Sequence, residues 1–344
     1  MKLLYAKSEA EGARWEDYVR TSPLATCYHR WKWKQVIERS FGWPAYYLMA
    51  AEGDHIVGVL PLVWQRSVLF GSFMTSLPFF NAGGILADSK EVKRSLLDEA
   101  IAIARKNRAA SIEFRHREFH ELGLPVKSNK VTMVLPIHGD SEITWKALDT
   151  KMRTKVRKAQ GFGMVAEFGG SEFLDDFYSV FADNMRELGT PVYSRNFFAG
   201  ILDTFPEDTY LCRVRHDRTV VAVSFLCAYR ERIEAVWSSS LHSHLHLKPN
   251  MFLYWSLLAH FGALGYRLFD FGRSSVGSGT YAFKQQWGAE PQPLYWDTWL
   301  ASGRSELPER NPDNPKYRLA IRAWQKLPLP ITKLLGPRIV RCLP

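Results

Sequence analysis

The feature that most constrains the fold of this chain is an internal repeat. The segment YLMAAEGDHIVGVLPLV begins at Tyr47, and YLCRVRHDRTVVAVSFL begins 163 residues later at Tyr210. Each has Tyr-Leu, an Asp seven residues after the Tyr and a β-branched run, which predicts a hairpin with a polar turn. The same offset carries Ser8 onto Ser171, and both have the chemistry of a helix N-cap. The repeat predicts two copies of one α/β unit.

The order of elements within each copy indicates the fold. Each copy is predicted to run helix, helix, hairpin strands, helix, strand. Antiparallel hairpins followed by a late helix are typical of an acetyltransferase-like (GNAT-like) domain. We therefore predict an α/β (α+β) fold with two tandem GNAT-like domains. The predicted domain limits are residues 1–145, 146–300 with a basic entry helix, and a Pro-rich basic tail over 301–344.

Length and composition limit the class of protein. A chain of 344 residues suits two domains, and 46% hydrophobic residues can bury a large core. The four cysteines form no CxxC pair, which indicates free thiols in a reducing compartment. The N-terminus lacks the apolar core of a signal peptide, and no run of 18 uncharged apolar residues occurs. We expect a protein of the cytoplasm or of the inner face of the plasma membrane.

Positive charge is clustered between the two copies. The net charge of +10 favours anionic partners. Residues 145–163 are predicted to form a helix, and residues 146–158 hold six Lys or Arg against one acid. Lys151, Lys155 and Lys158 share a face, where like charges repel unless an anion lies near. We predict an anion-binding site there; a solvated helix face is the alternative.

The tail from residue 301 has nine Lys or Arg, seven prolines and three acids. Residues 315–344 contain a short amphipathic helix and Pro-broken apolar turns. This tail can pack back on the protein. It can also lie on an anionic bilayer, with Leu319, Ile321 and Trp324 toward the lipid. Both alternatives stay open at the level of sequence.

Standard catalytic motifs are absent from the sequence, including G-x-x-x-x-G-K-[ST], G-x-S-x-G and H-E-x-x-H. His242, His244 and His246 alternate, but no carboxylate or Cys lies near, so a polar loop is favoured and no metal is predicted. The Gly-rich loop with which GNAT-like domains bind the pyrophosphate of acyl-CoA is expected near HLHLKPNMFLYW, residues 244–255, which has no glycine. No tightly bound cofactor is predicted.

Residues 248–291, KPNMFLYWSLLAHFGALGYRLFDFGRSSVGSGTYAFKQQWGAEP, resemble the closing signature of the Fem family of peptidyl (aminoacyl) transferases. The shared features are a helix ending in Gly, a strand ending Asp-Phe-Gly, a Ser/Gly loop and Phe-Lys-x-x-aromatic-Gly. Residues 152–164 look like the family's basic helix, and residues 77–85 look like its Gly-Gly loop. The sequence is most similar to Fem-related proteins associated with exosortase (PEP-CTERM) and exopolysaccharide clusters.

The resemblance implies two GNAT-like domains with a cleft between them. It implies transfer of an amino acid from charged tRNA to an amine of a nucleotide- or lipid-linked peptidoglycan precursor. Lys284 would neutralise charge on the donor or the developing oxyanion, and Phe283 would shape the site. Asp270, Glu113 and the phosphate of the substrate remain candidates for the general base. The alternative for Lys284 is a structural ion pair with Asp270 or Glu290.

Further residues are carried over as substrate-binding candidates. Lys34 lies near the position of a phosphate-binding lysine of the family, with Ile37 as the alternative match, and Arg195 matches a second phosphate-binding cation. Aromatic side chains near Lys284 could stack on a terminal adenosine. The full set of expected substrate-binding residues is Lys34, Arg195, Tyr193, Arg273, Tyr281, Trp287, Asn81, Gly83 and Gly84.

Two classes of function therefore compete. The first is a Fem-type acyltransferase whose donor is aminoacyl-tRNA or acyl-CoA and whose acceptor is an amine of an anionic envelope precursor, in peptidoglycan or exopolysaccharide. The second is a non-catalytic basic module that binds anionic glycolipid or RNA. Lys284 discriminates between them, because loss of a residue that acts in the transition state lowers turnover more than affinity.

Overall fold

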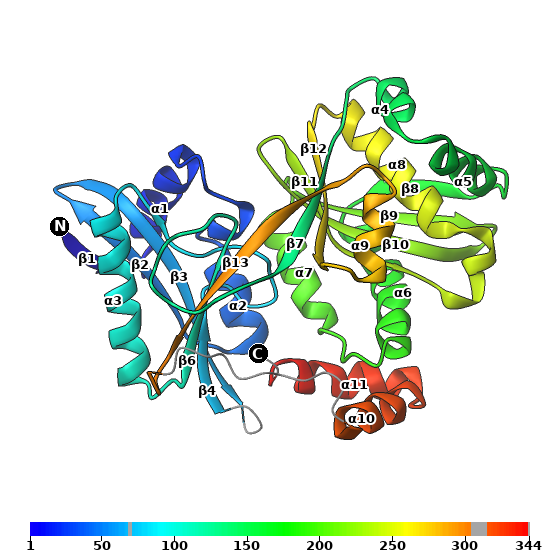
Figure 1. Ribbon diagram of the computed structural model, residues 1–344. Helices are drawn as coiled ribbons and strands as arrows, with labels where there is room; N and C mark the ends of the chain where they lie inside the picture. The colour runs from blue at the N-terminus through cyan, green and yellow to red at the C-terminus, as the bar shows by residue number, and fades with distance from the viewer. Residues whose placement is uncertain (68–70, 304–314, 343–344) are drawn as a thin grey trace. The chain divides into compact units, whose positions relative to one another are not determined.

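The computed structural model describes residues 1–67, 71–303 and 315–342 (Figure 1). The chain forms two compact units. Unit 1 takes in Met1–Val131, Pro293–Glu309 and Arg341–Pro344, and unit 2 takes in Thr132–Gln292 and Arg310–Val340. The sequence prediction placed the limits at residues 145 and 300. The boundaries between the units instead lie within two strands, after Val131 and after Gln292. Residues 132–145 therefore belong to unit 2, and residues 293–300 belong to unit 1.

Unit 1 is built on one sheet with strand order β1-β2-β3-β4-β6-β13, and β5 pairs with β3. Its elements are β1 (Lys2–Tyr5), α1 (Glu9–Thr21), η1 (Cys27–His29), α2 (Trp33–Phe41), β2 (Ala45–Glu52), β3 (His55–Ser67), β4 (Gly71–Thr75), β5 (Leu86–Ala87), α3 (Lys90–Lys106), β6 (Ser111–His116) and most of β13 (Glu290–Leu300).

Unit 2 has a sheet with strand order β8-β9-β10-β11-β12-β7. Its elements are the second half of β7 (Val126–Pro136), α4 (Ser141–Ala147), α5 (Thr150–Gln160), β8 (Val165–Gly169), η2 (Ser171–Phe173), α6 (Leu174–Glu187), α7 (Arg195–Thr204), β9 (Thr209–His216), β10 (Thr219–Tyr229), β11 (Arg232–Ser240), η3 (His242–Leu247), α8 (Pro249–Ala263), β12 (Leu268–Ser275), α9 (Gly279–Gln285), α10 (Pro315–Gln325) and α11 (Leu329–Val340).

The two units repeat one plan, as the sequence predicts. In each unit an edge strand and two helices precede a hairpin, β2 and β3 in unit 1 and β9 and β10 in unit 2. A further strand, a helix and a last repeat strand follow. The pairs β4 with β6 and β11 with β12 are parallel, whereas the hairpins are antiparallel. This confirms the predicted mixed α/β class.

The units exchange their final strands. In unit 1 the strand beside β6 is β13, which comes from the end of the second repeat and pairs with β6 from Tyr295 to Leu300. In unit 2 the strand beside β12 is β7, which directly follows β6 in the chain. Each sheet is therefore completed by a strand that the other repeat supplies.

Both faces of the unit 1 sheet are buried. Leu48 and Leu60 face α3, where they pack with Leu96. The next residue along β2, Tyr47, points to the other face, and its ring lies 4.7 Å from Trp15 of α1, measured between centroids. This alternation follows from the two-residue period of a strand, and it explains why the strands read as nearly continuous apolar runs.

In unit 2, α6 and α8 cover opposite faces of the sheet (Figure 1). Phe177 of α6 packs on Phe225 of β10 with ring centroids 5.6 Å apart. Phe261 of α8 packs on Tyr210 of β9, which pairs with Leu226, the residue after Phe225. The C-terminal part of α8 is thus packed on the sheet through Phe261.

The basic entry helix differs from the sequence prediction. One helix was expected from Trp145, but the structure has two, because the Asp149 carboxylate accepts a hydrogen bond from the backbone N–H of Met152 at 2.6 Å and caps a new helix. The helix α5 that begins at Thr150 carries Lys151, Lys155 and Lys158.

The tail packs back on unit 2. The side chain of Trp324 is buried and Gln325 Nε2 donates to the backbone oxygen of Glu187 at 2.7 Å. Gly336 approaches the backbone of Val192 so closely that an added Cβ would lie 2.8 Å from Val192 N. One alternative expected Trp324 to face lipid. Its burial against the protein rules out that part of the alternative. None of the described helices is long and apolar enough to cross a membrane.

Candidate functional site

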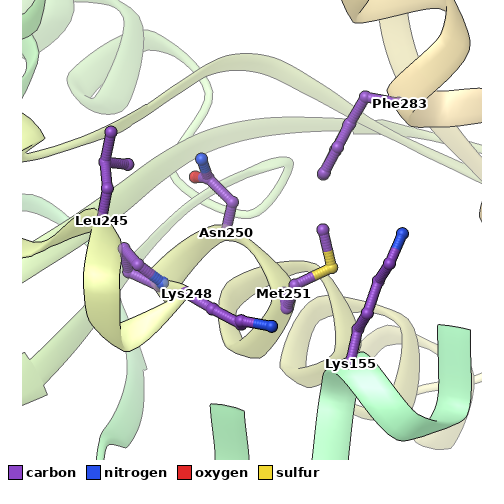
Figure 2. Close-up of a pocket in the computed structure, with 7 residues that line it drawn as sticks. Lys155, Leu245, Lys248, Asn250, Met251 and Phe283 are labelled. Atoms are coloured by element: carbon purple, nitrogen blue, oxygen red, sulfur yellow. The ribbon is translucent and has the colours of Figure 1, made fainter. Parts of the chain in front are cut away.

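A pocket of about 290 Å³ opens at the N-terminus of α8 (Figure 2). Lys248 precedes the helix in the left-handed conformation, with φ of 57° and ψ of 47°, and Pro249 takes the first helical position. The sequence Lys-Pro-Asn thus turns the chain sharply into α8. The pocket is lined by Lys155, Leu245, Lys248, Pro249, Asn250, Met251 and Phe283.

The pocket is suited to an anion with an apolar part. First-turn amides such as that of Asn250 have no intrahelical acceptor, and the helix dipole adds positive potential there. Lys155 of α5 and Lys248 add two ammonium groups, and Lys155 Nζ donates to Gln286 Oε1 at 2.7 Å. In Figure 2 the side chains of Met251 and Phe283 point toward one another beside Lys155. These features favour a phosphate group with an apolar or aromatic neighbour.

Lys284 follows Phe283 in α9 and is almost fully buried, with 7% of its surface exposed. Its Nζ donates to the backbone oxygens of Gly272 at 2.8 Å and Arg273 at 3.0 Å. Burial lowers the pKa of Lys284 to about 8, although the charge of Asp270 acts in the opposite direction. Within the described parts of the chain Nζ has these two acceptors, so its third N–H can serve a substrate oxygen.

Asp270 supports Lys284 indirectly. Its carboxylate is 0% exposed and accepts hydrogen bonds from the Gly272 N–H at 2.8 Å and from the Thr132 hydroxyl. Gly272, with φ of 74°, thus gives its N–H to Asp270 and its carbonyl to Lys284. This arrangement does not support the role of general base that was a candidate for Asp270, because substrate cannot reach the carboxylate. The alternative expectation for Lys284 was an ion pair with Asp270 or Glu290. In the structure its Nζ instead donates hydrogen bonds to two backbone carbonyl oxygens.

Aromatic rings brace α9. Phe283 lies 5.6 Å from Tyr254 and 6.4 Å from Trp287, measured between ring centroids. Trp287 is buried, so it packs against the protein rather than offering a face to an adenosine. Tyr281, in the first turn of α9, is half-buried, and its N–H donates to the Ser278 hydroxyl at 3.2 Å. Phe283 is therefore the ring that the pocket presents.

Other predicted residues of unit 2 lie outside the pocket. Arg195, at the start of α7, is paired with Asp175 at 2.6 Å. Tyr193 belongs to an aromatic cluster and lies 6.0 Å from Trp237. Arg273 is exposed, as are Lys151 and Lys158 on α5. The structure thus places Lys155 and Phe283 in the lining of the pocket, with Lys284 as the residue after Phe283 in α9. The roles of the other residues stay predictions.

In unit 1, Lys34 is held by its neighbours. Its Nζ donates to both carboxylate oxygens of Glu38 at 2.8 Å and lies 5.9 Å from the Trp31 ring centroid. Ile37, the alternative match, is fully buried and packs in the core. A phosphate-binding role for Lys34 stays a prediction, and it would require exchange of Glu38 for the phosphate.

The predicted Gly-Gly loop is buried in unit 1, and two histidines hydrogen-bond to its backbone. The Gly84 oxygen accepts from His29 Nε2 at 3.2 Å, and the Ile85 N–H, on the same peptide group, donates to His116 Nε2 at 3.0 Å. His116 Nδ1 then donates to Asp297 Oδ2 at 2.9 Å. Both imidazoles must be neutral and in opposite tautomers for these bonds to form.

Close packing also accounts for the loop glycines. An added Cβ at Gly84 would lie 2.2 Å from the His116 ring, and Gly83 has φ of 114°. Asn81 is buried, and its backbone oxygen accepts from Trp296 Nε1 at 3.4 Å. The structure gives Asn81, Gly83 and Gly84 a packing role, and their predicted contact with substrate has no support from exposure.

We expect acid to destabilise unit 1 through its buried histidines. Burial lowers the pKa of His29 and of His116 to about 3. Below the ordinary value of about 6.5 the unfolded chain binds protons at these positions while the folded chain does not. The free energy of unfolding should therefore fall as the pH is lowered from about 6.5 toward 3.

Urea titrations monitored by tryptophan fluorescence at several pH values would measure this slope. Burial raises the pKa of Asp297 to about 6, so this carboxyl binds its proton first in the folded state and offsets part of the loss between about pH 6 and 4. A His29→Gln variant should show a shallower acid slope. An unchanged slope in that variant would contradict the assignment of His29 as a buried neutral group.

Sequence reasoning missed several of these residues. Lys248, Asn250 and Met251 lie in the segment that was set aside because it lacks glycine. The signal that could have found them is Lys-Pro-Asn at a helix start, since Pro marks the first helical position. His242, His244 and His246 lie in the 3-10 helix η3. Among the residues that the structure describes, no group of three or more His, Cys, Asp or Glu could hold a metal ion.

Comparisons with known proteins bear on the class. Residues 147–285 match the family model described as an acetyltransferase (GNAT) domain. The chain is 23% identical over 220 residues to the lipid II:glycine glycyltransferase of Staphylococcus aureus strain MRSA252, which covers 56% of this chain and 50% of that protein. It is 22% identical over 220 residues to the same enzyme of strain NCTC 8325 / PS 47. The chain spans about half the length of the curated relatives it matches.

Solved structures show the same fold at low identity. The crystal structure of FemX has a TM-score of 0.65 at 15% identity, covering 86% of this chain and 97% of that one. A tandem GNAT protein from the clavulanic acid biosynthesis pathway has a TM-score of 0.56 at 12% identity, covering 89% and 99%. L-PGS from Bacillus licheniformis has a TM-score of 0.54 at 10% sequence identity, covering 95% of this chain and 96% of that one.

These likenesses confirm the predicted tandem GNAT-like fold and support the predicted acyltransferase class. The GNAT match spans both α5 and α9, so it contains the pocket and Lys284. Residues 147–285 thus match the acetyltransferase (GNAT) domain model, and the chain is similar in sequence to lipid II:glycine glycyltransferases.

Proposed function

We propose that this protein is a Fem-like N-acyltransferase that transfers an aminoacyl or acyl group to an amine of a cell-envelope precursor. The observation that carries the proposal is the pairing of a two-lysine pocket at the start of α8 with the buried Lys284 one residue after Phe283. The first feature can bind the phosphate of a donor, and the second can stabilise an oxyanion. The sequence similarity to glycyltransferases supports the same class.

In the proposed reaction, the acceptor amine attacks the carbonyl carbon of the donor. A C–N bond forms, the C–O or C–S bond to the carrier breaks, and the amine proton passes to a base and then to the leaving oxygen or sulfur. Negative charge develops on the carbonyl oxygen in between. A fixed N–H donor in a dry site stabilises that charge strongly, which is the role we assign to the third N–H of Lys284.

Two donors fit the pocket, aminoacyl-tRNA and an acyl-CoA. Both join a phosphate to an adenosine and a reactive ester or thioester. Lys248 stands where the ordinary CoA site would have glycines, which favours a phosphodiester held by side chains over a pyrophosphate held by backbone amides. On that ground we propose aminoacyl-tRNA first.

The acceptor remains one of two classes. A nucleotide- or lipid-linked peptidoglycan precursor follows from the similarity to lipid II:glycine glycyltransferase. An amino sugar of an exopolysaccharide follows from the resemblance to exosortase-associated proteins. In both cases the reacting group is an amine attached to an anionic carrier.

Fluorescence anisotropy with a labelled, non-hydrolysable aminoacyl-tRNA tests the proposal, with acyl-CoA in excess as competitor. Binding that needs the aminoacyl end and ignores CoA is the expected result. Binding displaced by CoA would keep the acyltransferase and change the donor. Binding of uncharged RNA with equal affinity, and no transfer from either donor, would favour the non-catalytic basic module.

Substitutions on α5 and at the start of α8 test where the donor binds. Lys155→Gln and Lys248→Gln should each weaken donor affinity roughly tenfold, because a charge-assisted hydrogen bond is lost in a pocket. Lys151→Gln and Lys158→Gln are matched controls on the exposed part of α5 and should change affinity less than about twofold. Equal losses in all four variants would indicate a general electrostatic surface and would contradict the pocket assignment.

A further inference from the structure

The end of the chain carries charge of one sign. From Pro315 to Pro344 the sequence has seven Lys or Arg and no Asp or Glu. The basic residues are Lys316, Arg318, Arg322, Lys326, Lys333, Arg338 and Arg341. Helices α10 and α11 hold five of these seven, and Lys326 and Arg341 each follow directly after the end of a helix. Such a segment repels itself unless it meets an anionic partner.

One side of these helices packs against the rest of unit 2. Trp324 and Thr332 are buried there. Lys333 Nζ lies 5.4 Å from the centroid of the Tyr178 ring on α6, and Ile321 approaches Gly189. The helices are therefore held in place by their inner side, and their outer side is presented in a fixed orientation.

The outer side exposes large aliphatic side chains among the cations. Leu319 is 66% exposed and Leu334 is 64% exposed. Leu319 and Arg322 of α10 and Lys326, the residue directly after its end, follow the spacing i, i+3 and i+7. On α11 the same spacing relates Ile331, Leu334 and Arg338. We call these six residues the tail face. Each helix thus shows apolar residues followed by basic ones along one stripe.

We propose that the tail face docks on the surface of an anionic lipid bilayer. Leu319 and Leu334 would enter the boundary between headgroups and acyl chains, and the basic side chains would meet the lipid phosphates. RNA would also attract the cations, but it offers no place where exposed leucines are removed from water. The combination of both features on each helix therefore favours lipid.

This proposal deepens the proposed function, because docking would serve transfer to a lipid-linked acceptor and in that respect rests on the proposed function. A lipid-linked acceptor lies in a bilayer, so a protein held at that surface meets the acceptor in two dimensions. Docking itself depends only on the tail face and not on the transferase site. The two proposals can therefore fail separately.

Co-sedimentation of the full chain with vesicles tests the docking without donor or acceptor. Binding to phosphatidylcholine vesicles that contain phosphatidylglycerol should exceed binding to pure phosphatidylcholine and should weaken with salt. The double variant Leu319→Ser/Leu334→Ser should lower the partition coefficient roughly tenfold or more, and Arg322→Gln/Lys326→Gln should lower it by about the same factor. Leu264→Ser, at a leucine that is 55% exposed outside the tail, and Arg20→Gln are the matched controls and should not change it.

Three results would overturn the proposal. One is no binding to the anionic vesicles. Another is vesicle binding that the leucine variant leaves unchanged, which would leave only nonspecific charge attraction. The third is anisotropy showing that an RNA hairpin binds the tail face more tightly than the vesicles do, with loss in the arginine-lysine variant alone. Unchanged thermal unfolding of the variants would confirm that these exposed substitutions do not disturb the fold.

Discussion

Replacing Lys284 by methionine should lower kcat roughly 10²- to 10³-fold while donor affinity changes little. Methionine has a similar length and fits the buried site, but it donates no hydrogen bond. The carbonyls of Gly272 and Arg273 lose their donor and the oxyanion loses its partner. Single-turnover transfer from the donor that passes the binding test gives kcat, and anisotropy gives affinity. Lys106→Met, an exposed lysine of α3, is the control and should keep full activity.

The pH profile tests the form in which Lys284 acts. The pKa of this lysine is lowered to about 8, so the charged form is lost as the pH rises through that value. If the ammonium is the active form, kcat should fall on the alkaline side, and this fall should be missing from the profile of Lys284→Gln. A rise through pH 8 that depends on Lys284 would make the neutral amine a general base and would contradict the assignment. Turnover that survives in Lys284→Met would remove the catalytic role altogether.

Gly84→Ala should destabilise unit 1 strongly, by roughly 3 kcal/mol or more. The new Cβ would lie 2.2 Å from His116 Cδ2 and 2.8 Å from the backbone oxygen of Arg115. The ring cannot swing away cheaply, because Ile85 and Asp297 hold its two nitrogens. Urea unfolding at neutral pH, followed by tryptophan fluorescence, measures the change in the free energy of unfolding.

A matched glycine separates the clash from a general effect of alanine. At Gly139 the nearest atom to an added Cβ is 3.8 Å away, so Gly139→Ala should change the free energy of unfolding by less than about 0.5 kcal/mol. His116→Ala should itself be destabilising, but the double variant with Gly84→Ala should lose less than the sum of the two. Full additivity would show that the imidazole is not what Gly84 accommodates.

Much of the fold could be predicted because its information is local and occurs twice. Hairpins of β-branched residues and helix caps such as Ser8 define elements within a few residues of sequence. The prediction of a matching cap at Ser171 was wrong, because Ser171 is the first residue of the 3-10 helix η2. The two-helix entry to unit 2 was missed because Asp149 sits inside one apolar-periodic stretch, where a cap and an interior residue look alike. The exchange of final strands was also missed, since pairing between distant segments leaves no local pattern.

The candidate site divides in the same way. Lys284 and Phe283 were found because they belong to a contiguous motif. Lys248 was missed because the pocket was expected to use glycine, and the chain uses a left-handed lysine before proline instead. The hydrogen bonds to the Gly84–Ile85 peptide group join His29 to Gly84 across 55 positions and Ile85 to His116 across 31, so only the folded chain shows them.

The exchanged strands bear on how such a chain is made and inherited. The side chain of His116 on β6 is hydrogen-bonded to that of Asp297 on β13 across 181 positions. At synthesis rates of about 5–20 residues per second, roughly 10–35 s therefore pass between the synthesis of β6 and that of its neighbouring strand. During that time β6 has an unpaired edge, which could pair with another chain. A recombination event that separated the two repeats would leave the sheet of each unit without its last strand. The two halves of the gene can therefore diverge in sequence, but they must be inherited as one unit.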